Sequence, residues 1–368
     1  MTVPSPPLPG APPPASLSVD LDNRWSYEMI HGEPGWDRYA SYLDRLVPRL
    51  LEVLEATGLR VTCFVVGRDA AEGSHHDVLG AIARAGHEIG NHSFSHRPWL
   101  HRMSDTQIAD EVTRAEDAIG AATGVHPRGF RGPGYSLSAT TLRVLRDRGY
   151  AYDASMLPTV IGPLARAWYF RSARLSAAQR AERHRLYGRV RDGFTPLRPY
   201  RWDLGDDGPT LLEIPVTTFP GIRVPMHVSY LLALAGRSPR AATAYFAAAL
   251  GACRVAGVEP SLLLHPLDLL GGDDLTDEER SRLAFFPGTA MPGARKRELV
   301  RGFLDRLRRG WRVVTLGEHA AVADRRLLHA RPAPTDTPGR DPDAQGARTG
   351  ADATATGEVH GAVAGPEA

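Results

Sequence analysis

Short apolar runs alternate with helix-like segments along most of this chain, and this alternation limits its fold more than any other feature. Such alternation is typical of parallel sheets, because two parallel strands need a crossover connection between them. The predicted strands are residues 17–20, 60–66, 87–90, 128–131, 150–153, 211–216, 261–264 and 311–315. About eight strands of this kind favour a closed (β/α) barrel over an open sheet.

The segments between these runs carry helix start and stop signals. Residues 39–57 have apolar side chains at helical spacing and are followed by Gly58, and residues 77–85 form a second predicted helix. Ser104 is placed to cap a helix that ends near residue 122, and Ser138 to cap one that ends at residue 147.

The two ends of the chain lack core-forming residues. Residues 1–14 are rich in proline, and residues 331–368 consist mainly of Ala, Thr, Gly, Pro and Asp. Such segments bury too little apolar surface to offset the entropy of ordering them, so we expect both to be disordered. The folded domain is predicted at 15–330, with 154–210 as a long insertion after the fifth strand.

Composition excludes some classes of partner and location. The net charge is only +2, and no nucleic-acid-binding motif is recognisable, so we expect no nucleic-acid partner. Cys63 and Cys253 lie in apolar runs and are predicted to be buried free thiols. No secretory signal and no apolar run of spanning length is present. We interpret the protein as cytoplasmic, and a position on a membrane surface stays open.

Two short stretches place metal-binding side chains at strand ends. Asp20 and Asp22 close the first predicted strand, and His92 and His96 follow the third. Asp22 with the two imidazoles would supply three protein ligands and leave a coordination position for water, while Asp20 stays free as a base. The alternative is a surface histidine pair beside a loop acid, because two histidines at this spacing also occur by chance.

Three further segments follow in order: Arg131-Gly132-Pro133-Gly134, Asp153-Ala154-Ser155 and Leu263-Leu264-His265-Pro266. Together with the two stretches above, they resemble the five ordered motifs of the polysaccharide deacetylase family (the NodB-homology domain, carbohydrate esterase family 4). The resemblance covers about residues 15–320 and implies an α/β fold, a distorted (β/α) barrel of about seven to eight strands. The long helical insertion after the fifth strand is additional to a minimal barrel.

The resemblance implies a role for each motif residue. Asp20 would be the catalytic base, and Asp22, His92 and His96 would be the metal ligands. Arg131 would orient the base, since a guanidinium favours the ionised form of a nearby carboxylate. The backbone N–H of Gly134 would stabilise the oxyanion, and His265 would be the general acid, with Asp153 hydrogen-bonded to it. Alternatively, Arg131 caps a turn, His265 is a core histidine and Asp153 is an N-cap.

Three departures from the family pattern concern the substrate side of the site. One residue separates Asp20 from Asp22, as in a branch with some peptidoglycan deacetylases and the allantoinase-like amidohydrolases. Gly134 occupies a position usually held by an aromatic residue, and Leu157 one usually held by tryptophan. The resemblance therefore implies an intact catalytic set with an altered substrate wall.

The activity implied is metal-dependent hydrolysis of an acetyl group, with N-acetyl preferred over O-acetyl, on a sugar, polysaccharide or lipid-linked saccharide. One alternative is hydrolysis of a non-glycan amide, and another is a catalytically inactive barrel that binds glycan or lipid. The ligand set suits Zn²⁺ and also accepts Co²⁺, Ni²⁺, Mn²⁺ or Fe²⁺.

Two aromatic segments leave their functions open. Residues 166–201 contain ten arginines and two acids, with interleaved aromatic residues that continue to residue 202. This stretch is predicted either to meet anionic lipid head groups or a substrate phosphate, or to be a solvated helical face. Residues 23–37, with Trp25, Tyr27 and Trp36, are expected to form a loop at the rim of the site that stacks on sugar rings or packs on itself.

Overall fold

The computed structural model describes residues 12–171, 173, 175–184, 186, 190–205 and 208–329. Its centre is a nine-stranded sheet in which β6, β7, β5, β4, β3, β2, β1 and β8 are neighbours in this order, with β9 paired to β1. The strands are β1 (Pro14–Asp20), β2 (Thr62–Val65), β3 (Glu88–Asn91), β4 (Gly129–Phe130), β5 (Tyr152–Asp153), β6 (Tyr200–Trp202), β7 (Leu211–Glu213), β8 (Ser261–Leu264) and β9 (Arg312–Val314).

All eight predicted strands are present, and every pairing among them is parallel. β6 was not predicted: it lies at the end of the insertion and pairs antiparallel with β7. Its sequence, Tyr-Arg-Trp, contains a charged residue and only its last residue is buried, so it forms no apolar run that would mark a strand.

The sheet curls into a distorted barrel, as predicted, and its two ends meet just beyond β7. The N–H of Thr217 donates to the carbonyl of Ser261 at 2.9 Å, and the N–H of Ser261 donates to Oγ1 of Thr217 at 2.8 Å. In the described part of the chain, β7 and β8 form no strand ladder. The barrel is therefore closed by single hydrogen bonds, so its wall is weakest between β7 and β8.

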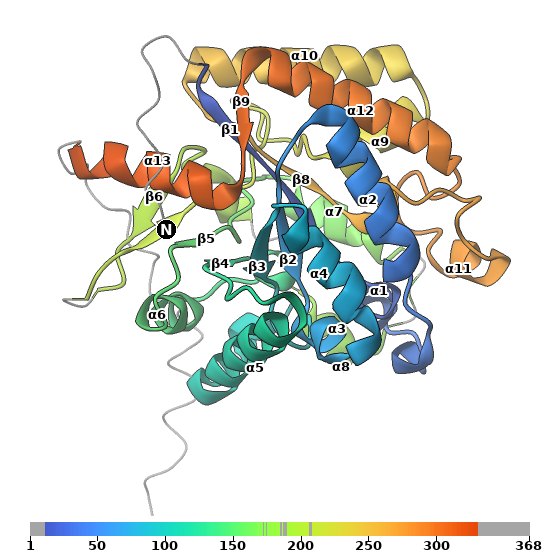
Figure 1. Ribbon diagram of the computed structural model, residues 1–368, viewed down its shortest axis with the longest axis horizontal. Helices are drawn as coiled ribbons and strands as arrows, with labels where there is room; N and C mark the ends of the chain where they lie inside the picture. Colours follow the sequence, from blue (N-terminus) through green and yellow to red (C-terminus); the bar gives the residue numbers. More distant parts are fainter. Residues whose placement is uncertain are drawn as a thin grey trace, which may run out of the picture.

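Helices surround the sheet (Figure 1). α10, α12, α2, α4, α5 and α6 contact one another in this order and form an arc along the sheet. The helices are α1 (Arg24–His31), α2 (Leu43–Thr57), α3 (Gly67–Ala71), α4 (His76–Arg84), α5 (Asp105–Thr123), α6 (Ala139–Asp147), α7 (Gly162–Tyr169), α8 (Ala177–Glu182), α9 (Val228–Ala235), α10 (Pro239–Ala256), α11 (Asp277–Arg282), α12 (Gly293–Gly310) and α13 (Leu316–His329). None of the helices described is long and apolar enough to cross a membrane.

The predicted helix caps are largely as expected. Ser104 accepts a hydrogen bond from the N–H of Gln107 in a capping box, and Gly124 ends the same helix in the left-handed conformation. The side chain of Ser138 accepts from the N–H of Thr141 and caps α6. Gly58 ends α2 with φ of 63°. These local signals were sufficient to place the ends of three helices.

The expectation of a loop over residues 23–37 was wrong. Asn23 accepts a hydrogen bond from the N–H of Arg24 and caps α1, and Gly32 ends that helix at φ of 81°. All eight residues of α1 are buried, so the segment belongs to the core. Tyr27 and Ile30 of this helix nevertheless line the cavity of the candidate site, so part of the segment does lie beside that site.

The predicted ends and insertion are described only in part. Most of 1–14 and all of 331–368 lie outside the described residues, as does Tyr187. Pro14 belongs to β1 and pairs with Arg312, so the predicted leader is too long at its inner end. The insertion contains the helices α7 and α8 and the strand β6.

Gly67 and Gly251 provide a matched test of helix packing. A Cβ on Gly67 would lie 2.5 Å from Cα of Ala115 on α5, so Gly67→Ala should lower the free energy of unfolding by about 1–3 kcal/mol. A Cβ on Gly251, inside α10, would meet no atom within 4 Å, so Gly251→Ala should raise it by about 0.5–1 kcal/mol. Urea unfolding of both variants measures the two effects. A Gly67→Ala protein as stable as wild type would contradict this packing of α3 on α5.

Candidate functional site

The residues singled out in the first two motifs lie at the carboxyl edge of adjacent strands. β1 ends at Asp20, and Asp20 is the register partner of Phe64 on β2. β3 ends at Asn91, directly before His92. It pairs with β2 on the side of β2 opposite β1. Because parallel strands end at the same edge of a sheet, these side chains converge.

Asp22, His92 and His96 form a cluster that could hold a metal ion. Their ligand atoms lie within 4.8 Å of one another, and all three residues are buried. Oδ1 of Asp22 is 3.3 Å from Nε2 of His92 and 2.9 Å from Nε2 of His96. The three predicted ligands are thus brought together in space.

Hydrogen bonding prepares these groups for a cation. Nδ1 of His92 lies 2.6 Å from the carbonyl oxygen of Arg131, so it is the donor nitrogen and leaves Nε2 directed toward Asp22, where it would ligate a cation. Burial opposes charge on Asp22, but the facing imidazoles of His96 and His92 hold the pKa of this carboxyl well below its usual range. An ionised carboxylate and two imidazole nitrogens fit a divalent ion.

The loop that carries both histidines is fixed from behind. Ser93 and His96 adopt positive φ angles of 59° and 50°, a conformation that is uncommon for residues other than glycine. Asn91 accepts from the N–H of Ser93 at 2.8 Å, and the Glu111 carboxylate accepts from Ser95 N–H at 2.8 Å and from Ser95 Oγ at 2.6 Å. Asn91 and Glu111 were not predicted, because their contribution depends on contacts between β3, its loop and α5.

Arg131 and Asp20 form a buried ion pair, with Nη1 of the arginine 2.7 Å from Oδ1 of the aspartate. The same Nη1 donates to Ser18, and Nε donates to the carbonyl of Ala154 at 2.9 Å. The other carboxylate oxygen of Asp20 is 4.0 Å from Nε2 of His92. Asp20 is therefore held beside the three candidate metal ligands with one oxygen available, as a base would require.

The predicted hydrogen bond between Asp153 and His265 is wrong. Asp153 accepts from Oγ of Ser155 at 2.7 Å and is hydrogen-bonded to Glu213, its register partner on β7. Four strands separate β5 from β8 in the sheet order. Burial raises the pKa of both carboxyls, and the charge of Asp153 raises that of Glu213 further. We infer that this pair shares one proton and has a structural role.

His265 has other partners instead. Its Nδ1 lies 3.0 Å from Oγ of Ser229, which donates to the buried carboxylate of Asp268 at 3.0 Å. That carboxylate also accepts from the backbone N–H of His265 at 2.8 Å. Ser229 and Asp268 therefore take the position expected for Asp153. Asp268 follows His265 by three residues, but nothing in the sequence linked Ser229 to either residue.

The segment after β8 is anchored by Lys296, the only lysine in the chain. Its side chain is 0% exposed, and Nζ donates to the carbonyls of Leu267 and Leu270 at 2.6 Å and 2.8 Å. Burial lowers the pKa of Lys296 to about 8. This lysine on α12 thus fixes the backbone that immediately follows His265.

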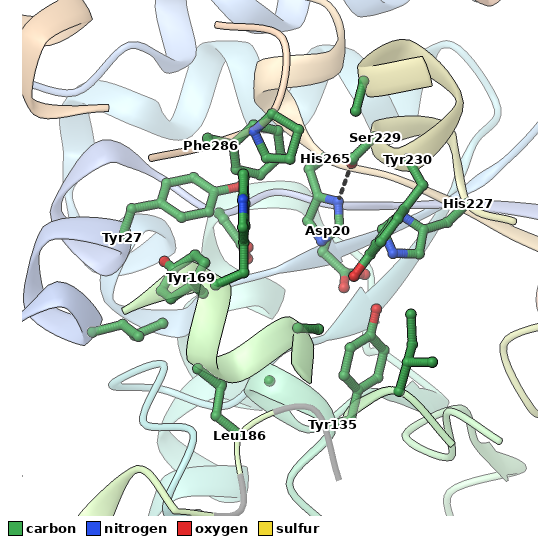
Figure 2. Close-up of a pocket in the computed structure, with 18 of the residues that line it drawn as sticks. Asp20, Tyr27, Tyr135, Tyr169, Leu186, His227, Ser229, Tyr230, His265 and Phe286 are labelled. Atoms are coloured by element: carbon green, nitrogen blue, oxygen red, sulfur yellow. Dashed lines mark hydrogen bonds between the residues drawn. The ribbon is translucent and has the colours of Figure 1, made fainter. Parts of the chain in front are cut away.

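A cavity of about 470 Å³ joins these groups. Asp20, Asp22, His92, His96, Gly134 and His265 all line it, and Figure 2 shows Asp20 and His265 between its two walls. Gly134 has φ of 58°, and a Cβ there would lie 2.4 Å from the side chain of Leu186, so a larger residue would be strained and would displace Leu186. The structure thus brings Gly134 and His265, the predicted oxyanion donor and general acid, to the cavity lined by the three candidate metal ligands.

His227 was missed by the sequence analysis. It lines the cavity with its ring centroid 5.6 Å from that of His265. Its Nδ1 is buried and lacks a hydrogen-bond partner among the described residues. Burial, followed by the proximity of His265, lowers the pKa of His227 well below its usual value, so the imidazole is neutral. A single histidine before an apolar helix offers no sequence signal for such a place.

Two regions with open predictions have internal packing. The rings of Trp25 and Trp36 pack against each other with centroids 5.6 Å apart, so the aromatic segment packs on itself. Nε1 of Trp25 also donates to Asp69. In the insertion, Arg183 donates to the carbonyls of Ile30 and Met29, and Arg166 donates to that of Leu186. These arginines therefore contribute to the fold of the insertion.

Comparison with known proteins links the chain to a family. Residues 36–152 match the model described as polysaccharide deacetylase. The chain is 31% identical to a peptidoglycan deacetylase from Helicobacter pylori over 111 residues, which are 30% of this chain and 37% of the relative. It is 32% identical to a chitin deacetylase from Pestalotiopsis sp over 104 residues, 27% of this chain and 34% of the relative. The alignments thus span about a third of these relatives.

The fold has a counterpart among solved structures. A candidate polysaccharide deacetylase from Mycobacterium smegmatis superposes with a TM-score of 0.55 at 20% identity, over 92% of this chain and 98% of that one. This likeness extends the shared fold to nearly the whole chain, including the segments outside the family match. Residues 36–152 thus match the polysaccharide deacetylase model, and the likeness in fold extends over nearly the whole chain.

Proposed function

We propose that this protein is a metal-dependent deacetylase that hydrolyses an N-acetyl group on a sugar-containing substrate. The observation that supports this most is the convergence of Asp20, the Asp22–His92–His96 cluster and His265 on one cavity. A base, a metal-ligand set and an acid in one cavity are the groups that amide hydrolysis needs. The relatives' names, peptidoglycan deacetylase and chitin deacetylase, point to the same substrate class.

The proposed reaction follows from the position of each side chain. A divalent ion held by Asp22, His92 and His96 would polarise the acetyl carbonyl and lower the pKa of water. Asp20, oriented by Arg131, accepts the proton of the attacking water. The N–H of Gly134 donates to the developing oxyanion. His265, oriented by Ser229 and Asp268, donates a proton to the leaving amine as the C–N bond breaks.

Several finer points stay predictions. Zn²⁺ is our preferred ion, with Co²⁺, Ni²⁺, Mn²⁺ and Fe²⁺ as alternatives. The acyl carrier is a sugar, a polysaccharide or a lipid-linked saccharide, and N-acetyl is preferred over O-acetyl. A cytoplasmic location and a contact of residues 166–202 with a membrane surface or phosphate also remain untested. A panel of acetylated sugars beside cyclic ureides and imides separates this proposal from a non-glycan amide hydrolase.

We expect the purified protein to contain close to one equivalent of divalent metal, and His92→Ala to lose it. The variant removes one of three ligands, and the other two would bind the ion far more weakly. Elemental mass spectrometry after chelator-free purification measures the content. His126→Ala is the control, because His126 is an exposed residue beyond α5. Metal-free wild type, even after reloading, would refute the metal site.

Replacement of the base should separate catalysis from metal binding. Asp20→Asn keeps the shape of the side chain but accepts a proton poorly, so we expect kcat to fall by about 10²–10⁴-fold. Metal content should stay at the wild-type level, because Asp22 is the carboxylate in the cluster. Acetate release from N-acetylglucosamine oligomers gives the rate. A kcat equal to that of an active wild type would exclude Asp20 as the base. If wild type itself released no acetate, a catalytically inactive binding barrel would be favoured instead.

Loss of the hydroxyl that orients His265 should reduce turnover more than substrate binding. Ser229→Ala removes the link between His265 and Asp268, so we expect kcat to fall by about tenfold or more with KM nearly unchanged. Ser238→Ala is the matched control, since Ser238 caps α10 and its loss should affect only stability, by about 1 kcal/mol. Steady-state kinetics of both variants tests the split. Equal kcat values for the two variants would contradict a positioning role for Ser229.

A further inference from the structure

The cavity beside the proposed catalytic groups is mostly apolar, and its apolar wall comes from outside the family match. Residues 36–152 match the family model, whereas the apolar wall is built largely by α7, Leu186 and Phe286. Ile161, Leu164, Ala165 and Trp168 contribute from α7 and its start. In the view of Figure 2, Tyr27, Tyr169, Leu186 and Phe286 lie together on one side of Asp20 and His265.

This wall continues to the protein surface. Leu164 is 68% exposed and Trp168 is 43% exposed, yet both line the same cavity. Single exposed apolar side chains are ordinary in soluble proteins, but a contiguous apolar strip that leads into a cavity is typical of a ligand site. The cavity therefore has an apolar entrance along α7 as well as an apolar wall.

Two residues that line the cavity carry buried polar atoms without a partner in the described part of the chain. Oη of Tyr27 and Nδ1 of His227 are buried without a hydrogen-bond partner among the described residues, and both residues line the cavity. The His227 ring is 5.6 Å from that of His265, and the Tyr27 ring is 5.6 Å from that of Phe286. Buried polar atoms without a partner are costly, so a ligand that offers hydrogen bonds at this depth would bind favourably.

An extended glycan chain would suit this arrangement poorly. Its hydroxyl groups would lose water along the α7 wall and find few partners there, whereas an apolar chain would gain by leaving water. The ligand that fits has a polar group next to His265 and an apolar group along α7. The ring of His227, beside that of His265 and with Nδ1 unpartnered among the described residues, favours a scissile amide at that end of the cavity.

We propose that the substrate is an amphiphile in which the acylated amino sugar carries an apolar substituent, and that this substituent binds along α7 and Phe286. This inference rests on the proposed deacetylase function and deepens it by naming the substrate class. The substituent is either the acyl chain itself or an aglycone on the sugar. Both sources have the same chemistry, and they differ in which side of the amide bond carries the apolar group.

Two substrate series distinguish these sources, each used below its critical micelle concentration. One varies the acyl chain of N-acylglucosamine from acetyl through butanoyl to octanoyl, and the other varies the β-glycoside of N-acetylglucosamine from methyl through butyl to octyl. Amine or acetate release gives kcat/KM, and calorimetric titration of the Asp20→Asn variant gives Kd without turnover. We expect the affinity to rise by about fourfold per buried methylene in one of the two series.

Leu164→Asp tests the wall itself. It should weaken the binding of the octyl or octanoyl member by at least tenfold relative to wild type. Leu328→Asp is the matched control, because Leu328 is also 68% exposed and lies on the last helix, α13; it should leave the chain-length dependence unchanged. A thermal unfolding curve for each variant shows whether it is folded.

The outcomes separate the two proposals. Turnover and binding that are both independent of chain length in both series would overturn the amphiphile inference while the deacetylase function stands. Binding that depends on chain length, with no turnover of any member by wild type, would support the apolar site and refute the deacetylase function. An equal loss in Leu164→Asp and Leu328→Asp would refute the placement of the apolar group on α7.

Discussion

The ion pair between Arg131 and Asp20 is the interaction on which both the barrel and the candidate site depend. Arg131 directly follows β4, is 0% exposed, and contacts four other strands or strand ends. Its guanidinium bonds Ser18 and Asp20 of β1 and the carbonyl that follows β5, and its Cζ lies 4.4 Å from the centroid of the Phe64 ring on β2. The backbone carbonyl of Arg131 accepts a hydrogen bond from Nδ1 of His92, which follows β3. Removing one member of such a buried pair costs about 3–5 kcal/mol.

This arrangement couples fold to chemistry. A buried arginine is tolerable only where acceptors surround it, and here one of those acceptors is the proposed base. Strand register therefore decides the orientation of Asp20, and the same register brings the backbone of Arg131 to the ring of His92. Any shift of β4 relative to β1 and β3 would disturb the proposed base and a proposed metal ligand together.

Much of the fold could be predicted because its signals are local. Alternating apolar runs gave the parallel strands, and Ser104, Ser138 and Gly58 marked helix ends. β6 could not be found in this way, since Tyr-Arg-Trp forms no apolar run. α1 was missed although Asn23 and Gly32 bound it, because its aromatic residues were given more weight than its caps.

In the candidate site too, residues in ordered motifs could be predicted, whereas contacts that depend on strand order could not. Asp20, Asp22, His92, His96, Arg131 and His265 were identified from ordered motifs, and the structure brings them to one cavity except for Arg131, which lies behind Asp20. The partner of His265 was predicted incorrectly, because strand order and register, which no single motif encodes, decide that Asp153 faces Glu213. His227 and Ser229 stand in no motif, so only the position of α9 reveals them. Their roles in catalysis stay proposals.

The single buried lysine gives this protein an internal reporter. Lys296 is the only lysine ε-amine in the sequence, it is closed off from solvent, and it donates to the carbonyls of Leu267 and Leu270 in the segment after His265. An amine-reactive reagent can acylate it only when the packing between α12 and this segment opens. Mass-spectrometric labelling of one residue would thus record the opening rate of the segment beside the proposed acid, with no engineered probe.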